Sequence, residues 1–171
     1  MILNIKTYPD KVLTKKTKPV GEVNVEIRKL IDDMVETLYA KRGAGLAANQ
    51  VGESKQIIVV DDSRNGGNIK VLINPKIVKK RGSVSMAEGC LSLPGLEFEI
   101  KRPEKIEVEY MDKRGQMQKI KANDLLARII CHETDHLNGK TMLDKLPLLK
   151  RLRLKQQLRK NNEVLSVGGG K

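Results

Sequence analysis

The feature that most constrains this chain is the segment His132-Glu133-Thr134-Asp135-His136, which contains both of its histidines. In a helix, residues four positions apart lie on one face, so both imidazoles can bind one metal ion while Glu133 lies beside it. A helix from about Asp124 to Asn138 is predicted by a cap at its start, an apolar stripe and Gly139 after its end. The alternative is a pair of histidines that only fill a half-buried helix face.

A catalytic site of this type needs three protein ligands and one open coordination position. Met142 stands where the extended protease motif has its third histidine, and Glu163, the only later glutamate, lies in a tail that we expect to be exposed. The third ligand should therefore come from upstream, where Cys90 follows Gly89 in a short segment that Pro94 terminates. Cys131 competes, but it points about 100° away from His132 around the helix. We expect it to pack beside the site.

Length, composition and charge limit the class of protein. A chain of 171 residues with 39% hydrophobic residues has the size of one domain and is long enough to bury a hydrophobic core. It has neither an apolar run of membrane-spanning length nor a signal-peptide layout at its start, so we expect a cytoplasmic protein without membrane contact. The net charge of +12 favours polyanionic partners, but four scattered aromatic residues argue against specific recognition of single-stranded nucleic acid.

Other segments predict an α+β fold, with antiparallel or mixed sheets packed around the motif helix. An amphipathic helix is expected from Asn24 to about Lys41, followed by a tight glycine-rich loop over residues 43–52. Two hairpins are expected, one with strands 56–61 and 69–73 around a solvated tip and one with strands 105–111 and 116–121. Asn74-Pro75 should end the second strand, and residues 79–81 should form a basic turn.

The C-terminal part is expected to be an appendage of the same domain. Residues 1–147 should form the catalytic metallohydrolase unit, and residues 148–171 a basic helix to about Lys160 and a tail whose end, 168–171, should be disordered. The helix could dock on ribosomal RNA, or it could be a solvated helix with Leu149, Leu152 and Leu158 packed on the domain. Its basic residues are Lys150, Arg151, Arg153, Lys155, Arg159 and Lys160.

Three blocks of the sequence, in this order, resemble the signature blocks of the peptide deformylases. They are Gly-Ala-Gly-Leu-Ala-Ala-Asn-Gln at 43–50, Glu-Gly-Cys-Leu-Ser at 88–92 and His-Glu-Thr-Asp-His at 132–136, and the resemblance runs from Pro9 to about Leu146. It implies that Cys90, His132 and His136 bind one divalent metal ion. Ferrous iron is the physiological metal that the family implies, and Zn²⁺ or Ni²⁺ can also occupy such a site.

The resemblance also implies an activity, namely removal of the N-formyl group from the formyl-methionine of nascent polypeptides, with release of formate. Glu133 would be the catalytic acid/base, and the Gln50 amide and the Leu91 N–H would polarise the formyl oxygen. We expect the substrate to lie against Gly43, Gly45 and Gly89. Leu125 and Ile129 are candidates for the pocket of the methionine side chain, while Arg128, in the same neighbourhood, has no assigned role.

Two other classes of protein remain alternatives at this point. A zinc endopeptidase would share the motif helix but would need a different third ligand and an extended substrate cleft. A non-enzymatic ribosome- or RNA-associated protein would explain the charge and would bind no metal.

Overall fold

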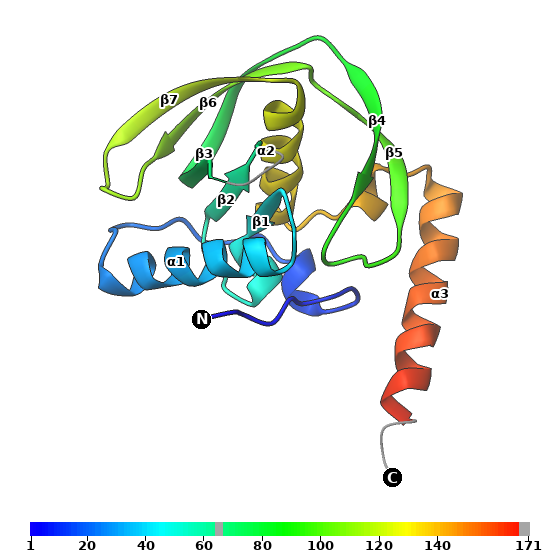
Figure 1. Cartoon of the computed structure of the whole chain (residues 1–171). Coiled ribbons are helices and arrows are strands. Elements are labelled where there is room, and N and C mark those ends of the chain that lie inside the picture. Colours follow the sequence, from blue (N-terminus) through cyan, green and yellow to red (C-terminus); the bar gives the residue numbers. More distant parts are fainter. Residues whose placement is uncertain (64–66, 168–171) are drawn as a thin grey trace.

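The computed structural model of the chain describes residues 1–63 and 67–167, with residues 161–167 described by their backbone alone. Its centre is a five-stranded antiparallel sheet with strand order β1-β2-β3-β6-β7, and a separate two-stranded sheet pairs β4 with β5 (Figure 1). The α+β class predicted from the sequence is confirmed. The strands are β1 (Gly45–Ala47), β2 (Ile57–Asp61), β3 (Ile69–Arg81), β4 (Val84–Gly89), β5 (Glu97–Arg102), β6 (Lys105–Met111) and β7 (Met117–Asn123).

Two helices cover opposite faces of the central sheet. The α1 helix (Val25–Ala40) starts where the Asn24 side chain accepts a hydrogen bond from Ile27 N, and its apolar stripe packs on one face. The α2 helix (Asp124–Leu137) carries the His-Glu-x-x-His motif and packs on the other. Strand β2 lies between them and is buried throughout, with Ile57 and Val59 toward α1 and Ile58 and Val60 toward α2. Both predicted helices are confirmed.

The second strand is longer than predicted, because Asn74-Pro75 does not end it. β3 continues to Arg81, and its register against β6 shifts between Ile73 and Lys76. Asn74 has a φ of 52°, and Pro75 has no N–H to give to the ladder, so the dipeptide forms an irregularity within the strand. The Asn74 side chain bonds the backbone N–H and C=O of Val20, which fixes the N-terminal segment there. Residues 79–81 are therefore strand, not a basic turn.

Two further regions differ from the sequence analysis, and part of a third is not described. Gly45–Ala47 forms strand β1, not a loop, and pairs with β2. Strands β4 and β5 had no prediction, although Phe98 and Ile100 alternate with exposed charged residues. Of the predicted hairpin tip, residues 64–66 lie outside the described residues.

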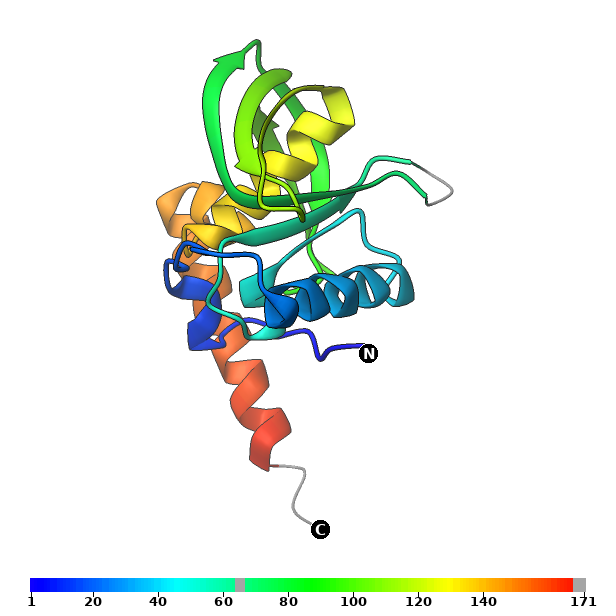
Figure 2. The ribbon, with the colours of Figure 1, turned by 90° about the vertical axis from the view of Figure 1, so that its left-hand side faces the viewer.

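The C-terminal helix α3 (Leu148–Val167) runs further than predicted and extends away from the rest of the chain (Figures 1 and 2). Leu154 and Leu158 pack against a cluster formed by β5, the N-terminal segment and the 3₁₀ helix Met142–Lys145, whereas Leu149 and Leu152 are exposed. Two other 3₁₀ helices span Lys11–Thr14 and Ala48–Val51. The predicted disordered tail, 168–171, lies outside the described residues. Among those that are described, no helix has both the length and the apolar character needed to cross a membrane.

Candidate metal centre

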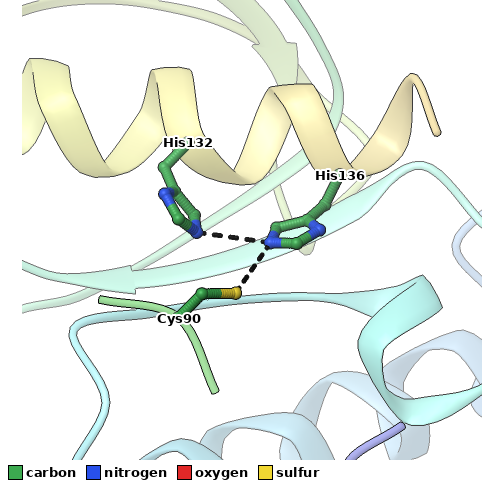
Figure 3. A group of neighbouring side chains, drawn as sticks. All are labelled: Cys90, His132 and His136. Carbon is green, nitrogen blue, oxygen red and sulfur yellow. Dashed lines mark hydrogen bonds between the residues drawn. The ribbon is translucent and has the colours of Figure 1, made fainter. Parts of the chain in front are cut away.

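Three side chains from two separate parts of the fold converge beside α2. His132 and His136 project from one face of the helix toward Cys90, which follows directly after β4 (Figure 3). The His136 Nε2 atom lies 3.2 Å from Cys90 Sγ and 3.2 Å from His132 Nε2, and all three donor atoms fall within 4.8 Å of one another. Donors bonded to one ion at about 2.0–2.3 Å would be spaced by roughly 3.3–3.6 Å. The cluster therefore fits a single divalent transition metal bound by one thiolate and two imidazoles.

A buried carboxylate orients the first histidine. Glu88 Oε2 lies 3.0 Å from His132 Nδ1, so this carboxylate can hold the Nδ1–H and turn Nε2 toward Cys90. Glu88 also accepts two hydrogen bonds from Arg102, at 2.7 and 2.9 Å, and one from Arg128. Arg102 continues the network to Asp135 at 2.7 Å. Burial alone would raise the pKa of Glu88, but hydrogen bonds from His132 and Arg102 outweigh it and lower the pKa to about 2.

The two histidines differ in protonation. Burial lowers the pKa of His132, but its interactions with Cys90 and Glu88 outweigh burial and raise the pKa to about 10. Burial and the neighbouring charge of His132 lower the pKa of His136 well below its usual value. His136 is thus neutral, as a ligand must be. A cation that binds Nε2 of His132 would displace its proton.

Glu133 is a buried carboxyl group without a full set of partners. Its side chain is 4% exposed, and Oε2 has no hydrogen-bond partner in the part of the chain that the structure describes. Burial raises the pKa of Glu133 to about 7, and the charges of His132 and Arg102 offset only part of this effect. A carboxyl group with such a pKa can both take and give a proton near neutral pH.

Gly45 in β1 allows the sheet to approach this carboxyl group closely. A Cβ atom on Gly45 would lie 2.5 Å from Glu133 Oε1 and 2.6 Å from Ile129 Cγ2, so no other residue fits without displacement. Gly43 is also crowded, with Leu38 and Leu91 at 2.9 and 3.1 Å from its Cβ position. At Gly89 the nearest atom is at 3.9 Å, so no close approach requires a glycine there.

Two further donors lie beside Cys90. The Gln50 amide is fixed because its Oε1 accepts from Ala47 N at 2.8 Å, which turns Nε2 toward Ser92 Oγ at 3.2 Å and Cys90 Sγ at 3.6 Å. The Leu91 N–H has no hydrogen-bond partner among the described residues. Both groups can therefore donate to an oxygen atom bound next to the cysteine.

The cluster opens into a cavity of about 500 Å³. All predicted site residues line this cavity except His136, which is only 1% exposed. Leu125 is 44% exposed and stands at the cavity's edge, whereas Ile129 is buried. The residues predicted from the sequence that line it are Gly43, Gly45, Gln50, Gly89, Cys90, Leu91, Leu125, Ile129, His132 and Glu133.

The remaining residues near the motif have structural partners. Cys131 packs in the cluster between α2 and the sheet, and burial raises the pKa of its thiol, so it takes no part in the ligand set. Asn49 Nδ2 donates to the backbone oxygen of His136 at 2.6 Å and anchors the end of α2. Sequence reasoning missed Glu88 and Arg102 as supports of the site. The one available signal was an acidic residue directly before Gly89 and Cys90.

Comparison with known proteins gives one consistent result. A sequence model described as "Polypeptide deformylase" matches residues 2–152. A peptide deformylase from Thermodesulfovibrio yellowstonii is 49% identical over 88% of this chain and 92% of its own length.

Solved structures agree with the sequence comparison. A crystal structure of a peptide deformylase from Legionella pneumophila superposes with a TM-score of 0.88 at 38% identity and covers 97% of this chain and 98% of that one. A peptide deformylase from Ehrlichia chaffeensis in complex with actinonin gives 0.86 at 42% identity, with coverage of 94% and 97%. These relatives support the deformylase interpretation over the endopeptidase and over the non-enzymatic protein.

Proposed function

Because this chain belongs to the polypeptide deformylase family, we propose that Cys90, His132 and His136 hold the metal ion on which its activity depends. The protein is a hydrolase that removes the N-formyl group from N-formyl-methionyl peptides. The observation that carries the residue assignment is the meeting of this donor cluster with the buried carboxyl group of Glu133 in one cavity.

Glu133 moves the protons in the proposed reaction. A bound divalent metal supplies Lewis acidity that makes water reactive toward a formyl carbon near neutral pH. The Glu133 carboxylate takes a proton from the attacking water as the new C–O bond forms. It then gives that proton to the peptide nitrogen as the C–N bond breaks, which yields formate and a free amino terminus. The unpartnered Oε2 atom supports this role, since no residue that the structure describes holds it away from substrate.

Gln50 and Leu91 stabilise the charge that develops on the formyl oxygen. The Gln50 Nε2 group and the Leu91 N–H lie on the Cys90 side of the cavity, where both can donate to one oxygen. Their backbone and amide dipoles are fixed before substrate binds, so they need no reorganisation during the reaction. Removal of one such donor typically lowers the rate about 100- to 1,000-fold.

We propose that the substrate is a nascent polypeptide beginning with formyl-methionine. Gly43, Gly45 and Gly89 give the peptide backbone room along the cavity, and Leu125 with Ile129 gives the stem of the first side chain an apolar wall. Ferrous iron is the proposed physiological metal, and Zn²⁺ or Ni²⁺ suits the same donors.

We further propose that residues 1–147 form the catalytic unit and that α3 docks on ribosomal RNA. Arg153, Arg159 and Lys160 are exposed, and none of the three has an ion-pair partner among the described residues. A variant with glutamate at these three positions should bind ribosomes more weakly, with a smaller salt dependence, than a control with glutamate at Lys113 and Arg114. Equal affinity and equal salt slope for the two variants would contradict docking. The cytoplasmic location stays a prediction.

One experiment tests metal, ligands and reaction together. We expect anaerobically purified protein to contain about one equivalent of a divalent transition metal and to release formate from formyl-Met peptides. Cys90→Ala should lose the metal and the activity, whereas Cys131→Ala, the matched control, should keep both. Full metal occupancy in Cys90→Ala would show that the ligand assignment is wrong.

A further inference from the structure

We propose that Asn49 is a positioning residue that holds the metal ligand His136 at both its backbone and its ring. Resting on the metal centre proposed above, this role adds a support for the second histidine. The first histidine, His132, is oriented by Glu88 through its Nδ1 atom. Asn49 gives His136 the equivalent support from a different part of the chain.

The backbone contact of Asn49 is short and buried. Its Nδ2 group donates to the backbone oxygen of His136 at 2.6 Å, and both residues are only 1% exposed. The same oxygen accepts from Gly139 N at 2.9 Å, so the carbonyl group has a partner without Asn49. The second donor is therefore not needed to satisfy this oxygen. What it does is tie the last turn of α2, which carries the ligand, to the segment that carries Asn49.

The ring of His136 and the amide of Asn49 have complementary unpaired atoms. When Nε2 binds a metal ion, the neutral ring carries its proton on Nδ1, and this N–H needs an acceptor. His136 Nδ1 has no partner among the described residues, and neither does Asn49 Oδ1, an acceptor on the residue already bonded to His136. Buried polar groups of this kind are commonly joined by an ordered water molecule. One water molecule that accepts from Nδ1 and donates to Oδ1 satisfies both atoms.

Two other buried side-chain acceptors lack a partner in the described part of the chain, and both are less suitable. Thr134 lies two positions before His136, and side chains two positions apart in a helix point to nearly opposite sides. The Oε2 atom of Glu133 belongs to a side chain that lines the cavity, whereas His136 does not line it. Asn49 Oδ1 is therefore the acceptor that fits the His136 ring.

The short helix that carries Asn49 also touches the other part of the donor cluster. Asn49 belongs to the 3₁₀ helix Ala48–Val51, and the next residue, Gln50, places its Nε2 atom 3.6 Å from Cys90 Sγ. One helix therefore contacts α2 through Asn49 and the cysteine through Gln50. This arrangement fixes the separation of His136 and Cys90 in advance, and a preorganised site loses less entropy when it binds an ion.

The Zn²⁺ affinity of three variants, measured by competition with a chelator, provides the first test. Asn49→Leu keeps the size of the side chain but removes both of its polar atoms, so the affinity should fall about 10- to 100-fold. Asn49→Asp keeps an acceptor for the ring N–H and should retain part of the affinity. Asn138→Leu is the matched control and should keep wild-type affinity. Asn138 also donates to a backbone oxygen near the end of α2, that of Thr134 at 2.8 Å, but it is exposed and does not contact a ligand.

The proton on His136 Nδ1 provides a second readout, which a purely structural role of Asn49 would not change. In the Zn²⁺-loaded wild-type protein, NMR should detect this imidazole N–H protected from exchange with water, together with that of His132. Asn49→Leu should speed the exchange of the His136 N–H. It should leave the His132 N–H as it is, because Glu88 holds that ring.

The outcomes separate this role from the metal centre itself. Wild-type Zn²⁺ affinity in Asn49→Leu, or an affinity of Asn49→Asp as low as that of Asn49→Leu, would overturn the positioning role alone. If Asn49→Leu does not fold, the wild-type spectrum decides, because a His136 N–H that exchanges freely with water would also overturn it. A wild-type protein that binds no metal would contradict the proposed centre, and the positioning role with it.

Discussion

The α1 and α2 helices pack on opposite faces of one sheet, but they bury different chemistry. The buried surface of α1 is formed mainly by Ile27, Ile31, Met34 and Leu38. The hydroxyl group of its buried Thr37 donates a hydrogen bond to the backbone oxygen of Asp33 within the helix. On α2, one side packs on the sheet in the same way, whereas the other buries Arg128, His132, Glu133 and His136. Apolar packing on both faces therefore stabilises the fold. The α1 side buries a single carboxylate of its own helix, Asp33, which Lys29 and the amino terminus neutralise. The α2 side buries a cluster of charged and titratable groups, for which desolvation is unfavourable and the site supplies the reason.

The largest effect is expected from Glu133 on the α2 side. Glu133→Gln keeps the shape of the side chain but removes the group that takes up and returns the proton. We expect kcat/KM on a formyl-Met peptide to fall about 10²- to 10⁴-fold. Metal content and the urea midpoint of unfolding should stay at wild-type values or rise, because the substitution removes the cost of ionising a buried carboxyl group. Activity within threefold of wild type would remove Glu133 from the mechanism.

Glu88 is expected to show the next largest effect, on both stability and metal binding. Glu88→Gln leaves the buried guanidinium groups of Arg102 and Arg128 without their shared counter-charge. Breaking a buried ion pair in this way typically destabilises a protein by about 3–5 kcal/mol. Loss of the group that orients His132 should also weaken metal affinity about 10- to 100-fold. Denaturant titration and competition with a metal chelator measure the two effects, and unchanged metal affinity would refute the orienting role.

Substitution of Met34 tests the role of apolar packing on the α1 side. It is fully buried in α1, so Met34→Ala should destabilise the protein by about 2–5 kcal/mol, the usual range for such a truncation. Below the unfolding transition, kcat/KM per folded molecule should stay within twofold of wild type, because α1 contributes no side chain to the donor cluster. A tenfold loss of activity in folded protein would show that the two faces are coupled more tightly than the packing indicates.

The smallest effect is expected at the start of α1. Asn24→Ala removes the side chain that accepts from Ile27 N at 2.9 Å, and we expect a loss of about 1 kcal/mol in the free energy of unfolding with no change in activity. Val25→Ala, at a neighbouring position that is 81% exposed, is the control and should change stability by less than about 0.5 kcal/mol. Equal effects of the two variants would mean that the cap contributes nothing.

Much of this architecture was predictable where the determinants are local. α1 has a capping residue, Asn24, and apolar residues at helical spacing, and α2 has the same spacing over residues 124–138. The β6–β7 hairpin has alternating polar and apolar residues on either side of the turn Asp112-Lys113-Arg114-Gly115. The motif on α2 fixed two members of the candidate site because their spacing alone decides that they share a face. The third, Cys90, followed from counting ligands and from the resemblance.

The rest depends on contacts between residues far apart in the chain. In the sequence, Glu88 looks like an ordinary exposed acidic residue. Its partners Arg102, Arg128 and His132 reach it only because β4 pairs with β5 and α2 packs beside them. The continuation of β3 past Asn74-Pro75 was equally hidden, because a proline normally ends a strand and only pairing with β6 carries the chain through. No local pattern specifies either arrangement.

The position of Cys90 at the end of the small sheet also has a mechanical consequence. Cys90 and His136 are 46 residues apart; the first follows directly after strand β4, and the second lies in a helix on the main sheet. An ion bound to both would close that segment into a loop and act as a cross-link, which restricts the unfolded chain as a disulfide does. The same ion would then serve both catalysis and stability. Loss of the ion should therefore lower the free energy of unfolding as well as abolish activity.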